Sequence, residues 1–191
     1  MRKKTIIICS SAYVLLMAIT FIVQHMSGDA SKWTDTLGRV SASLLPLLLL
    51  FMKRIPFPVT LIISYYLLIF CTFYLGATIR FYDKFKWWDT GTHVIGGIFM
   101  AYVAATLYKM SVPDSEDKNI SAWLLFLFTL SFSLFSSVIW EVIEFTASEM
   151  GKLEADSQKD TLTDLIAGLI GGVVAALAIV WTRKKGNLND H

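Results

Sequence analysis

Three pairs of ionisable side chains have the spacing and chemistry of a metal or acid–base site. Residues three or four positions apart lie on one face of an α-helix, so each pair would present two ligands on its helix. Carboxylate oxygens with one imidazole and no thiolate suit a hard or borderline ion, such as Mg²⁺, Mn²⁺, Ca²⁺ or Zn²⁺. The pairs are Asp89 with His93, Glu141 with Glu144, and Asp160 with Asp164.

The glutamate pair is the least easily explained by helix structure alone. Glu141 and Glu144 lie near the end of the apolar run 120–147, where the helix dipole disfavours negative charge. A metal ion, a nearby lysine side chain or protons retained by the carboxyl groups would compensate for it. The pair therefore favours a site but does not identify its ligand.

The other members of the pairs allow two interpretations. Asp89, Asp160 and Asp164 precede or begin apolar runs, where an aspartate commonly caps a helix and complements its dipole. A lone histidine most often packs or forms hydrogen bonds. The dipole near a helix start also disfavours imidazolium, which leaves His93 a neutral ring able to bind a metal or accept a proton.

The elements that must position these residues are membrane-spanning helices. Of 191 residues, 55% are hydrophobic and 17% are charged, and the mean hydropathy is +0.58, values typical of a polytopic membrane protein. About 20 helical residues cross about 30 Å of hydrocarbon. We predict an all-α fold, a single transmembrane domain over residues 1–191 with six helices in one bundle. The expected helices are 5–25, 37–52, 59–79, 91–108, 120–147 and 162–182.

The distribution of positive charge predicts the orientation in a cell membrane. With six spans both termini share one side, and that side holds ten of the 17 Lys and Arg residues. We therefore expect the N- and C-termini to be cytoplasmic. Helices 91–108 and 162–182 would then begin at the outer face and helix 120–147 would end there, so the paired residues would meet in an interfacial pocket.

Other features have structural explanations. The aromatic residues between 81 and 88 fit an interfacial belt, and glycines in two runs would let helices 91–108 and 162–182 approach closely. Cys9 and Cys71 lie within apolar runs, which argues against a disulfide framework or a thiolate metal site. We expect no nucleic acid partner, because no basic patch is interleaved with base-stacking aromatics. The glycine-rich sets are Gly96, Gly97 and Ala101, and Gly168, Gly172 and Ala176.

The motifs Trp88-Asp89-x-x-x-His93-x-x-Gly96-Gly97, Glu141-x-x-Glu144-Phe145 and Asp156-x-Gln158-x-Asp160 occur in this order. Together with Leu165-x-x-Gly168-x-x-Gly171, this set resembles the YjdF-like family of uncharacterised bacterial integral membrane proteins. It is more distantly similar to the VanZ-like family. The resemblance covers about residues 82–175 and implies a membrane core whose polar residues include Asp156 and Gln158 besides the pairs. It implies no established reaction, and it assigns no role to Asp83 or Asp164.

Two hypotheses from different classes follow. In the first, the protein is a membrane enzyme, dependent on a divalent metal ion, that acts on a lipid or lipid-linked substrate at the outer face. Asp89, His93, Glu144 and Asp160 would bind the ion, and Glu141 or Asp164 would act as general base. In the second, the acids form a proton- or cation-binding site of a small transporter, or a polar interaction scaffold. Further polar candidates are Asp83, Asp156 and Gln158.

Overall fold

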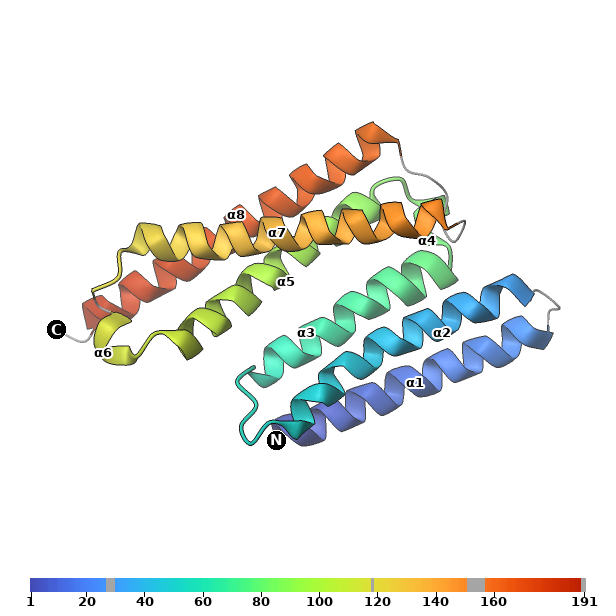
Figure 1. Ribbon diagram of the computed structural model, residues 1–191, viewed down its shortest axis with the longest axis horizontal. Helices are drawn as coiled ribbons and strands as arrows, with labels where there is room; N and C mark the ends of the chain where they lie inside the picture. Colours follow the sequence, from blue (N-terminus) through green and yellow to red (C-terminus); the bar gives the residue numbers. More distant parts are fainter. Residues whose placement is uncertain (27–29, 118, 151–156, 190–191) are drawn as a thin grey trace. The chain divides into compact units, whose positions relative to one another are not determined.

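The computed structural model describes residues 1–26, 30–117, 119–150 and 157–189, and every regular element in these ranges is helical (Figure 1). The predicted all-α class is therefore confirmed. The chain divides into two compact units, Met1–Phe81 and Tyr82–His191. A short helix, α4 (Phe81–Lys84), stands at the division between them.

The first unit is built from three helical segments. The helix α1 (Arg2–Met26) packs against α2 (Ala30–Leu44) and α3 (Val59–Ile69). The second segment continues as the 3₁₀ helix η1 (Leu45–Phe51). Its second residue, Pro46, lacks the N–H needed for an α-helical hydrogen bond. The third continues as the wider π-type helix η2 (Phe70–Thr78).

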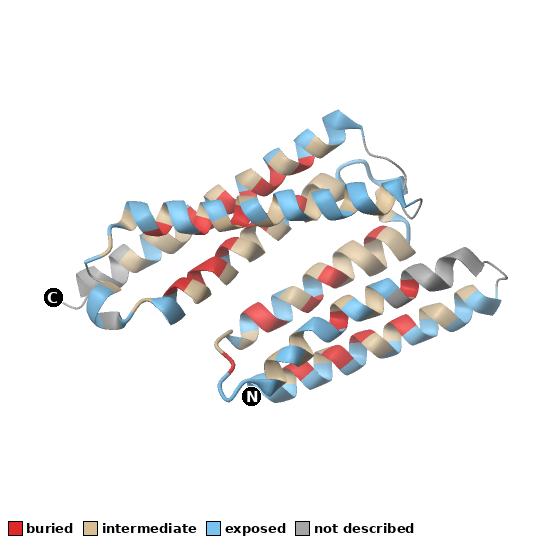
Figure 2. Cartoon of the chain, viewed as in Figure 1, coloured by how far each residue is buried: buried red, intermediate tan, exposed pale blue. Residues whose placement is uncertain are grey.

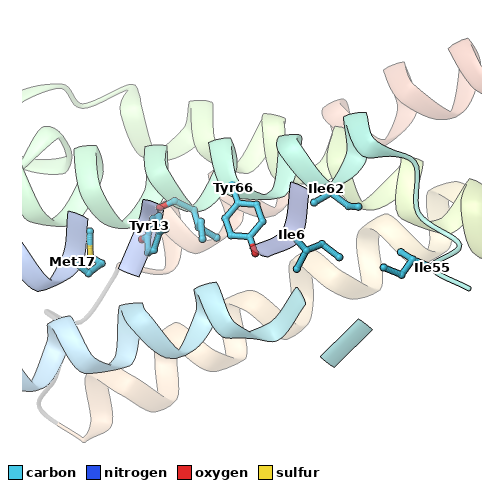
Figure 3. Packing of buried hydrophobic residues seen from close by; sticks show 7 residues of the cluster. Ile6, Tyr13, Met17, Ile55, Ile62 and Tyr66 are labelled. Carbon is cyan, nitrogen blue, oxygen red and sulfur yellow. Dashed lines mark hydrogen bonds between the residues drawn. The ribbon is translucent and has the colours of Figure 1, made fainter. Parts of the chain in front are cut away.

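Apolar side chains of α1, of α3 and of the connection before α3 form the buried core of the first unit, and partly buried side chains of α2 and η1 pack against it. Ile6 and Met17 of α1 are completely buried. Figure 3 shows them beside side chains of α3 and of the segment that leads into it. The burial of these residues fixes how the three segments pack. The buried core consists of Ile6, Tyr13, Met17, Ile55, Ile62, Tyr66 and Ile69.

Hydrogen bonds also cross between the helices of this unit. The Ser10 and Tyr66 hydroxyl groups lie 2.5 Å apart, and the Tyr65 hydroxyl donates to the carbonyl oxygen of Ala42 at 2.7 Å. The Arg39 Nη1 group donates to the Thr78 hydroxyl at 2.8 Å. Polar groups in a lipid environment require partners within the protein, so these bonds allow polar residues in mostly apolar helices.

The second unit is a three-helix bundle. The helices α5 (Trp88–Ser111), α7 (Ala122–Glu149) and α8 (Gln158–Asn189) each pack against the other two. The short helix α6 (Asp114–Asp117) lies between α5 and α7. Because the three long helices alternate in direction, α5 and α8 begin at the end of the bundle where α7 finishes (Figure 1).

Glycines bring α5 and α8 into backbone contact. A Cβ atom at Gly97 would overlap the carbonyl oxygen of Gly168, and one at Gly171 would overlap the carbonyl oxygen of Val94. Gly96 behaves differently, because a Cβ atom there would have nothing within 4 Å. The expected close approach of these helices is present, and it depends on Gly97 rather than on Gly96.

Five of the six predicted spans are helices long and apolar enough to cross a membrane. The second predicted span, 37–52, corresponds to a shorter apolar helix, Gly38–Phe51. The residues that precede it in α2 are more polar, and Pro46 interrupts its α-helical pattern. The five long spans are Arg2–Met26, Val59–Thr78, Trp88–Ser111, Ala122–Glu149 and Gln158–Arg183.

Large apolar side chains cover the outward faces of these helices. In α7, Phe135 is 64% exposed and Phe145 is 66% exposed, while buried residues lie on the sides that face the other helices (Figure 2). Outward apolar faces of this kind are suited to contact with lipid.

Candidate functional site

His93 lies at the centre of a polar cluster at one end of the second unit. It is in the second turn of α5 and is 8% exposed. One turn earlier on the same helix is Asp89, and across the bundle is Glu141 near the end of α7. The direction of the helices, predicted from the sequence, thus places these residues at the same end.

Both nitrogens of the His93 ring face a carboxylate. The Nε2 atom lies 3.6 Å from Asp89 Oδ1, and the Nδ1 atom lies 3.5 Å from Glu141 Oε1. Both separations exceed the usual N–H···O distance of about 2.7 to 3.2 Å. Two ligands at about 2.1 Å from a tetrahedral ion are about 3.4 Å apart, so the spacing matches neighbouring metal ligands.

Two overlapping groups of three side chains could each hold an ion. Asp89, His93 and Asp164 form one group, and His93, Glu141 and Glu144 form the other. Within each group, one ligand atom from every residue lies within 4.8 Å of the others. His93 belongs to both groups, so the cluster joins residues of all three helices.

Each group combines two buried members with one that is only partly buried. Asp164 is 6% exposed and the side chain of Glu141 is 10% exposed. One oxygen of each carboxylate is buried. The Asp89 side chain, by contrast, is 43% exposed. The first group therefore opens to the surroundings through Asp89, and the second opens through Glu144, which is only partly buried.

Small residues one helical turn away set the position of the cluster. Gly97 follows His93 by four positions, Gly168 follows Asp164 by four, and Ser137 precedes Glu141 by four. These three residues meet, since a Cβ atom at Gly97 would strike Gly168 and one at Gly168 would strike the Ser137 side chain. Residues four positions apart share a helix face, so this contact brings the ionisable residues together in the adjacent turn.

A hydrogen bond fixes α7 in this arrangement. The buried hydroxyl of Ser133 donates to the carbonyl oxygen of Gly97 at 2.9 Å. The same hydroxyl lies 2.7 Å from the position that a Cβ atom of Gly172 would occupy. The small residues therefore continue through a second turn, and side chains larger than serine would separate the helices there.

The structure separates Asp160 from its predicted partner Asp164. Asp160 is exposed at the start of α8, where its carboxylate accepts a hydrogen bond from the Ser157 hydroxyl at 2.6 Å. The backbone N–H of Asp160 donates to the Ser157 hydroxyl at 3.2 Å. This reciprocal pairing is typical of a helix N-terminus, and among the described residues Asp160 joins neither group of three.

The remaining sequence candidates lie outside the two groups. Asp83 is an exposed residue of α4, and Gln158 is an exposed first residue of α8. Asp156 lies outside the described residues. Glu144 belongs to the group of His93 and Glu141. The residues brought together are thus Asp89, His93, Glu141, Glu144 and Asp164.

A second polar cluster, at the opposite end of the bundle, was not predicted. The Tyr108 hydroxyl donates to Asp117 Oδ1 at 2.8 Å, and Arg183 Nη2 lies 3.3 Å from the same oxygen. Arg183 also donates to the carbonyl oxygen of Ile120 at 2.9 Å. These contacts join the end of α8 to the α6–α7 connection. No sequence spacing signals them, because Arg183 and Asp117 are 66 positions apart.

Comparison with known proteins identifies a family of membrane proteins but assigns no activity to it. The profile of a family described as "Predicted membrane protein (DUF2238)" matches residues 8–185. A relative from Thermotoga maritima, named only as an uncharacterized protein, is 31% identical over 116 residues. That match covers 59% of this chain and 57% of the relative. No solved structure matches the chain significantly. The narrower resemblance to YjdF-like and VanZ-like proteins stays a prediction.

Proposed function

We propose that the cluster around His93 binds one divalent metal ion. The chain belongs to the DUF2238 family of predicted membrane proteins. The protein would be a metal-dependent membrane enzyme that acts on a lipid or lipid-linked substrate at the outer face of the membrane. Asp89, His93 and Asp164 would be the protein ligands.

The observation that carries the proposal is the placement of His93 between two carboxylates. A metal-bound histidine usually directs its second ring nitrogen to a carboxylate or carbonyl group, which fixes the ring and its tautomer. Here Nε2 faces Asp89 and Nδ1 faces Glu141, at 3.6 and 3.5 Å. With an ion on the Nε2 side, a small shortening of the 3.5 Å separation would let Glu141 accept a hydrogen bond from the Nδ1–H group and orient the ring.

Solvent access at Asp89 suits a catalytic ion held by Asp89, His93 and Asp164. Catalytic metal sites commonly keep a coordination position for water or substrate. The Asp89 side chain is 43% exposed, which leaves room for such a position, whereas Glu141 is 10% exposed. An ion held by the second group would instead reach the surroundings through Glu144, on the side where α7 exposes Ile143 and Phe145.

The bound ion would act as a Lewis acid and lower the pKa of a coordinated water molecule. The chain's own contribution would be proton transfer by the second carboxylate pair. Because Glu141 would hold the His93 ring, Glu144 is the candidate proton acceptor. A carboxylate oxygen of Glu144 lies within 4.8 Å of a ring nitrogen of His93, and the residue is only partly buried.

The surroundings of Glu144 support a substrate that enters from the lipid. Ile143 and Phe145, its neighbours in α7, are 53% and 66% exposed. Both are apolar, so this end of α7 presents hydrocarbon-contacting side chains beside a carboxylate. A molecule with an acyl chain and a polar reactive group would contact both.

A pair of charge-neutralising variants tests the ligand assignment. We expect Asp164→Asn to weaken Mn²⁺ binding to the purified protein, measured by calorimetry, by at least about tenfold. Glu144→Gln would retain the ion, and Asp160→Asn serves as a control from the same helix as Asp164. If Glu144→Gln lost the ion and Asp164→Asn kept it, the ion would belong to the second group.

A second experiment tests the enzymatic activity. The protein would be incubated with a lipid extract, with and without Mn²⁺, and the lipids followed by mass spectrometry. We expect metal-dependent consumption of a lipid species, lost in Glu144→Gln while the ion still binds. Ion or solute flux into liposomes that is abolished by Glu141→Gln, without any lipid turnover, would instead favour a transporter.

A further inference from the structure

We propose that the first unit binds an anionic phospholipid at the end that holds the N-terminus. We call this surface the basic end, and we infer that it holds the lipid phosphate while the adjacent apolar residues contact the acyl chains. The inference is independent of the metal site in the second unit. The basic end consists of Arg2, Lys3, Lys4, Lys53 and Arg54.

Hydrogen bonds bring together cations that are distant in the sequence. Arg2 donates through Nη1 to the carbonyl oxygen of Ile55, and Lys3 donates through Nζ to that of Leu50 at 3.3 Å. These bonds attach the start of α1 to the end of η1 and to the connection between η1 and α3. Figure 1 shows the N-terminus beside this connection.

Buried packing supports the same arrangement. Ile55, next to Arg54, is 5% exposed and belongs to the core cluster that contains Ile6 of α1 (Figure 3). The connection is therefore anchored to α1 by apolar contacts as well as by hydrogen bonds. The cations at positions 53 and 54 have a defined location near those at positions 2 to 4.

Few negative charges oppose these cations. The first 81 residues contain only two acidic residues, Asp29 and Asp35. Asp35 is in the first half of α2, which runs antiparallel to α1 and lies alongside its second half. Charges separated by more than about 8 Å interact weakly at physiological salt. The basic end therefore retains a positive potential, to which Lys4, Lys53 and Arg54 contribute exposed side chains.

Apolar residues beside the basic end distinguish a lipid from free phosphate. Phe51 is 89% exposed, Leu48 is 62% exposed and Leu45 is 57% exposed, and all three belong to η1. An aromatic or aliphatic surface directly adjoining a group of cations is typical of residues at the membrane interface. The guanidinium group of Arg54 can donate two parallel hydrogen bonds to phosphate oxygens.

The test is lipid binding to the delipidated full-length protein, followed by native mass spectrometry. We expect phosphatidylglycerol to bind more tightly than phosphatidylcholine. The double variant Lys53→Gln/Arg54→Gln removes two exposed cations without disturbing the hydrogen bonds of Arg2 and Lys3. It should weaken phosphatidylglycerol binding by about 25-fold, or about fivefold for each cation.

A matched control removes the same charge elsewhere. The variant Lys86→Gln/Lys109→Gln neutralises two exposed lysines of the second unit and should leave the affinity unchanged. Equal binding of the two lipids, or an equal loss in both double variants, would overturn the proposal. If inorganic phosphate displaced phosphatidylglycerol at a similar concentration, the ligand would be phosphate and not a phospholipid, which would overturn the proposal. Unchanged thermal unfolding of the Lys53/Arg54 variant in neutral detergent would exclude a folding defect.

Discussion

The contact between α5 and α8 offers a sharp test, because two adjacent glycines in α5 differ completely in their surroundings. A Cβ atom at Gly97 would lie 3.0 Å from the carbonyl carbon of Gly168 and 3.1 Å from its Cα, with the carbonyl oxygen closer still. A Cβ atom at Gly96 would have nothing within 4 Å. We predict opposite effects of Gly97→Ala and Gly96→Ala on the free energy of unfolding.

The magnitudes follow from sterics and helix propensity. Replacing glycine by alanine within a helix stabilises it by about 1 kcal/mol, and at Gly96 nothing opposes this gain. At Gly97 the methyl group strikes backbone atoms of α8, which cannot rotate away as a side chain can. Overpacking of this kind costs about 1 to 3 kcal/mol, so we expect a net loss of up to about 2 kcal/mol.

The same substitution should also change the site. Restoring ordinary contact distances requires α5 and α8 to separate by about 1 Å. His93 and Asp164 lie one turn from this contact, so their separation would increase. We expect Gly97→Ala to weaken Mn²⁺ binding by at least about tenfold, since a metal site needs its ligands within about 0.5 Å of the productive geometry.

Chemical unfolding in detergent and calorimetric titration with Mn²⁺ measure these two effects. Gly96→Ala is the matched control, because it makes the same chemical change one position away. Equal stability and equal Mn²⁺ affinity of the two variants would refute the account of how α5 and α8 position the site.

Three further variants test contacts elsewhere in the second unit. Ser133→Ala should lower the free energy of unfolding by about 1 kcal/mol, because it removes the hydrogen bond to the Gly97 carbonyl; an unchanged midpoint of chemical unfolding would contradict this. Arg183→Gln should lower the free energy of unfolding by about 1 to 2 kcal/mol, because the contact with the partly exposed Asp117 and the hydrogen bond to the Ile120 carbonyl are lost, while Mn²⁺ affinity stays the same; a calorimetric loss of affinity would show that the two ends of the bundle are coupled. Asp160→Ala should lower the free energy of unfolding by about 0.5 to 1 kcal/mol, because its hydrogen bonds with Ser157 are lost, and it should leave the calorimetric Mn²⁺ affinity unchanged. Loss of Mn²⁺ binding in this variant would show that Asp160 is a ligand.

The sequence predicted the helices of the second unit well because each is a long apolar run that a membrane requires to be helical. The predicted run 120–147 compares with α7 at Ala122–Glu149, and 91–108 compares with α5 at Trp88–Ser111. The alternation of helix directions then placed His93 and Glu141 at one end of the bundle. Hydropathy and the order of the spans are sufficient to predict these helices and the end at which the two residues lie.

The membership of each candidate ligand group could not be predicted in the same way. By their spacing alone, Asp160 and Asp164 are equally good candidate ligands, since both lie on one face of α8. The structure separates them, because α8 begins at Gln158 and Asp160 pairs with Ser157, whereas Asp164 lies one turn deeper against α5. Depth along a helix depends on where the helix starts, and the apolar run alone does not define that residue.

Side-chain contacts between residues that are far apart in the sequence could likewise not be predicted. The pattern of glycines predicted that α5 and α8 approach closely, but it could not tell Gly96 from Gly97, whose roles depend on the rotation of the helix. The contact of Arg183 with Asp117 has no local signal.

The most direct test of the central claim, a metal ion bound through His93, is pulsed electron paramagnetic resonance of Mn²⁺ on protein labelled with ¹⁵N-histidine. The chain contains three histidines, His25, His93 and His191, so the label is simple to interpret. We predict a coupling from one directly bound ¹⁵N nucleus that is lost in His93→Gln and retained in His25→Gln. A Mn²⁺ spectrum without nitrogen coupling, or a coupling that persists in His93→Gln, would contradict the proposed site.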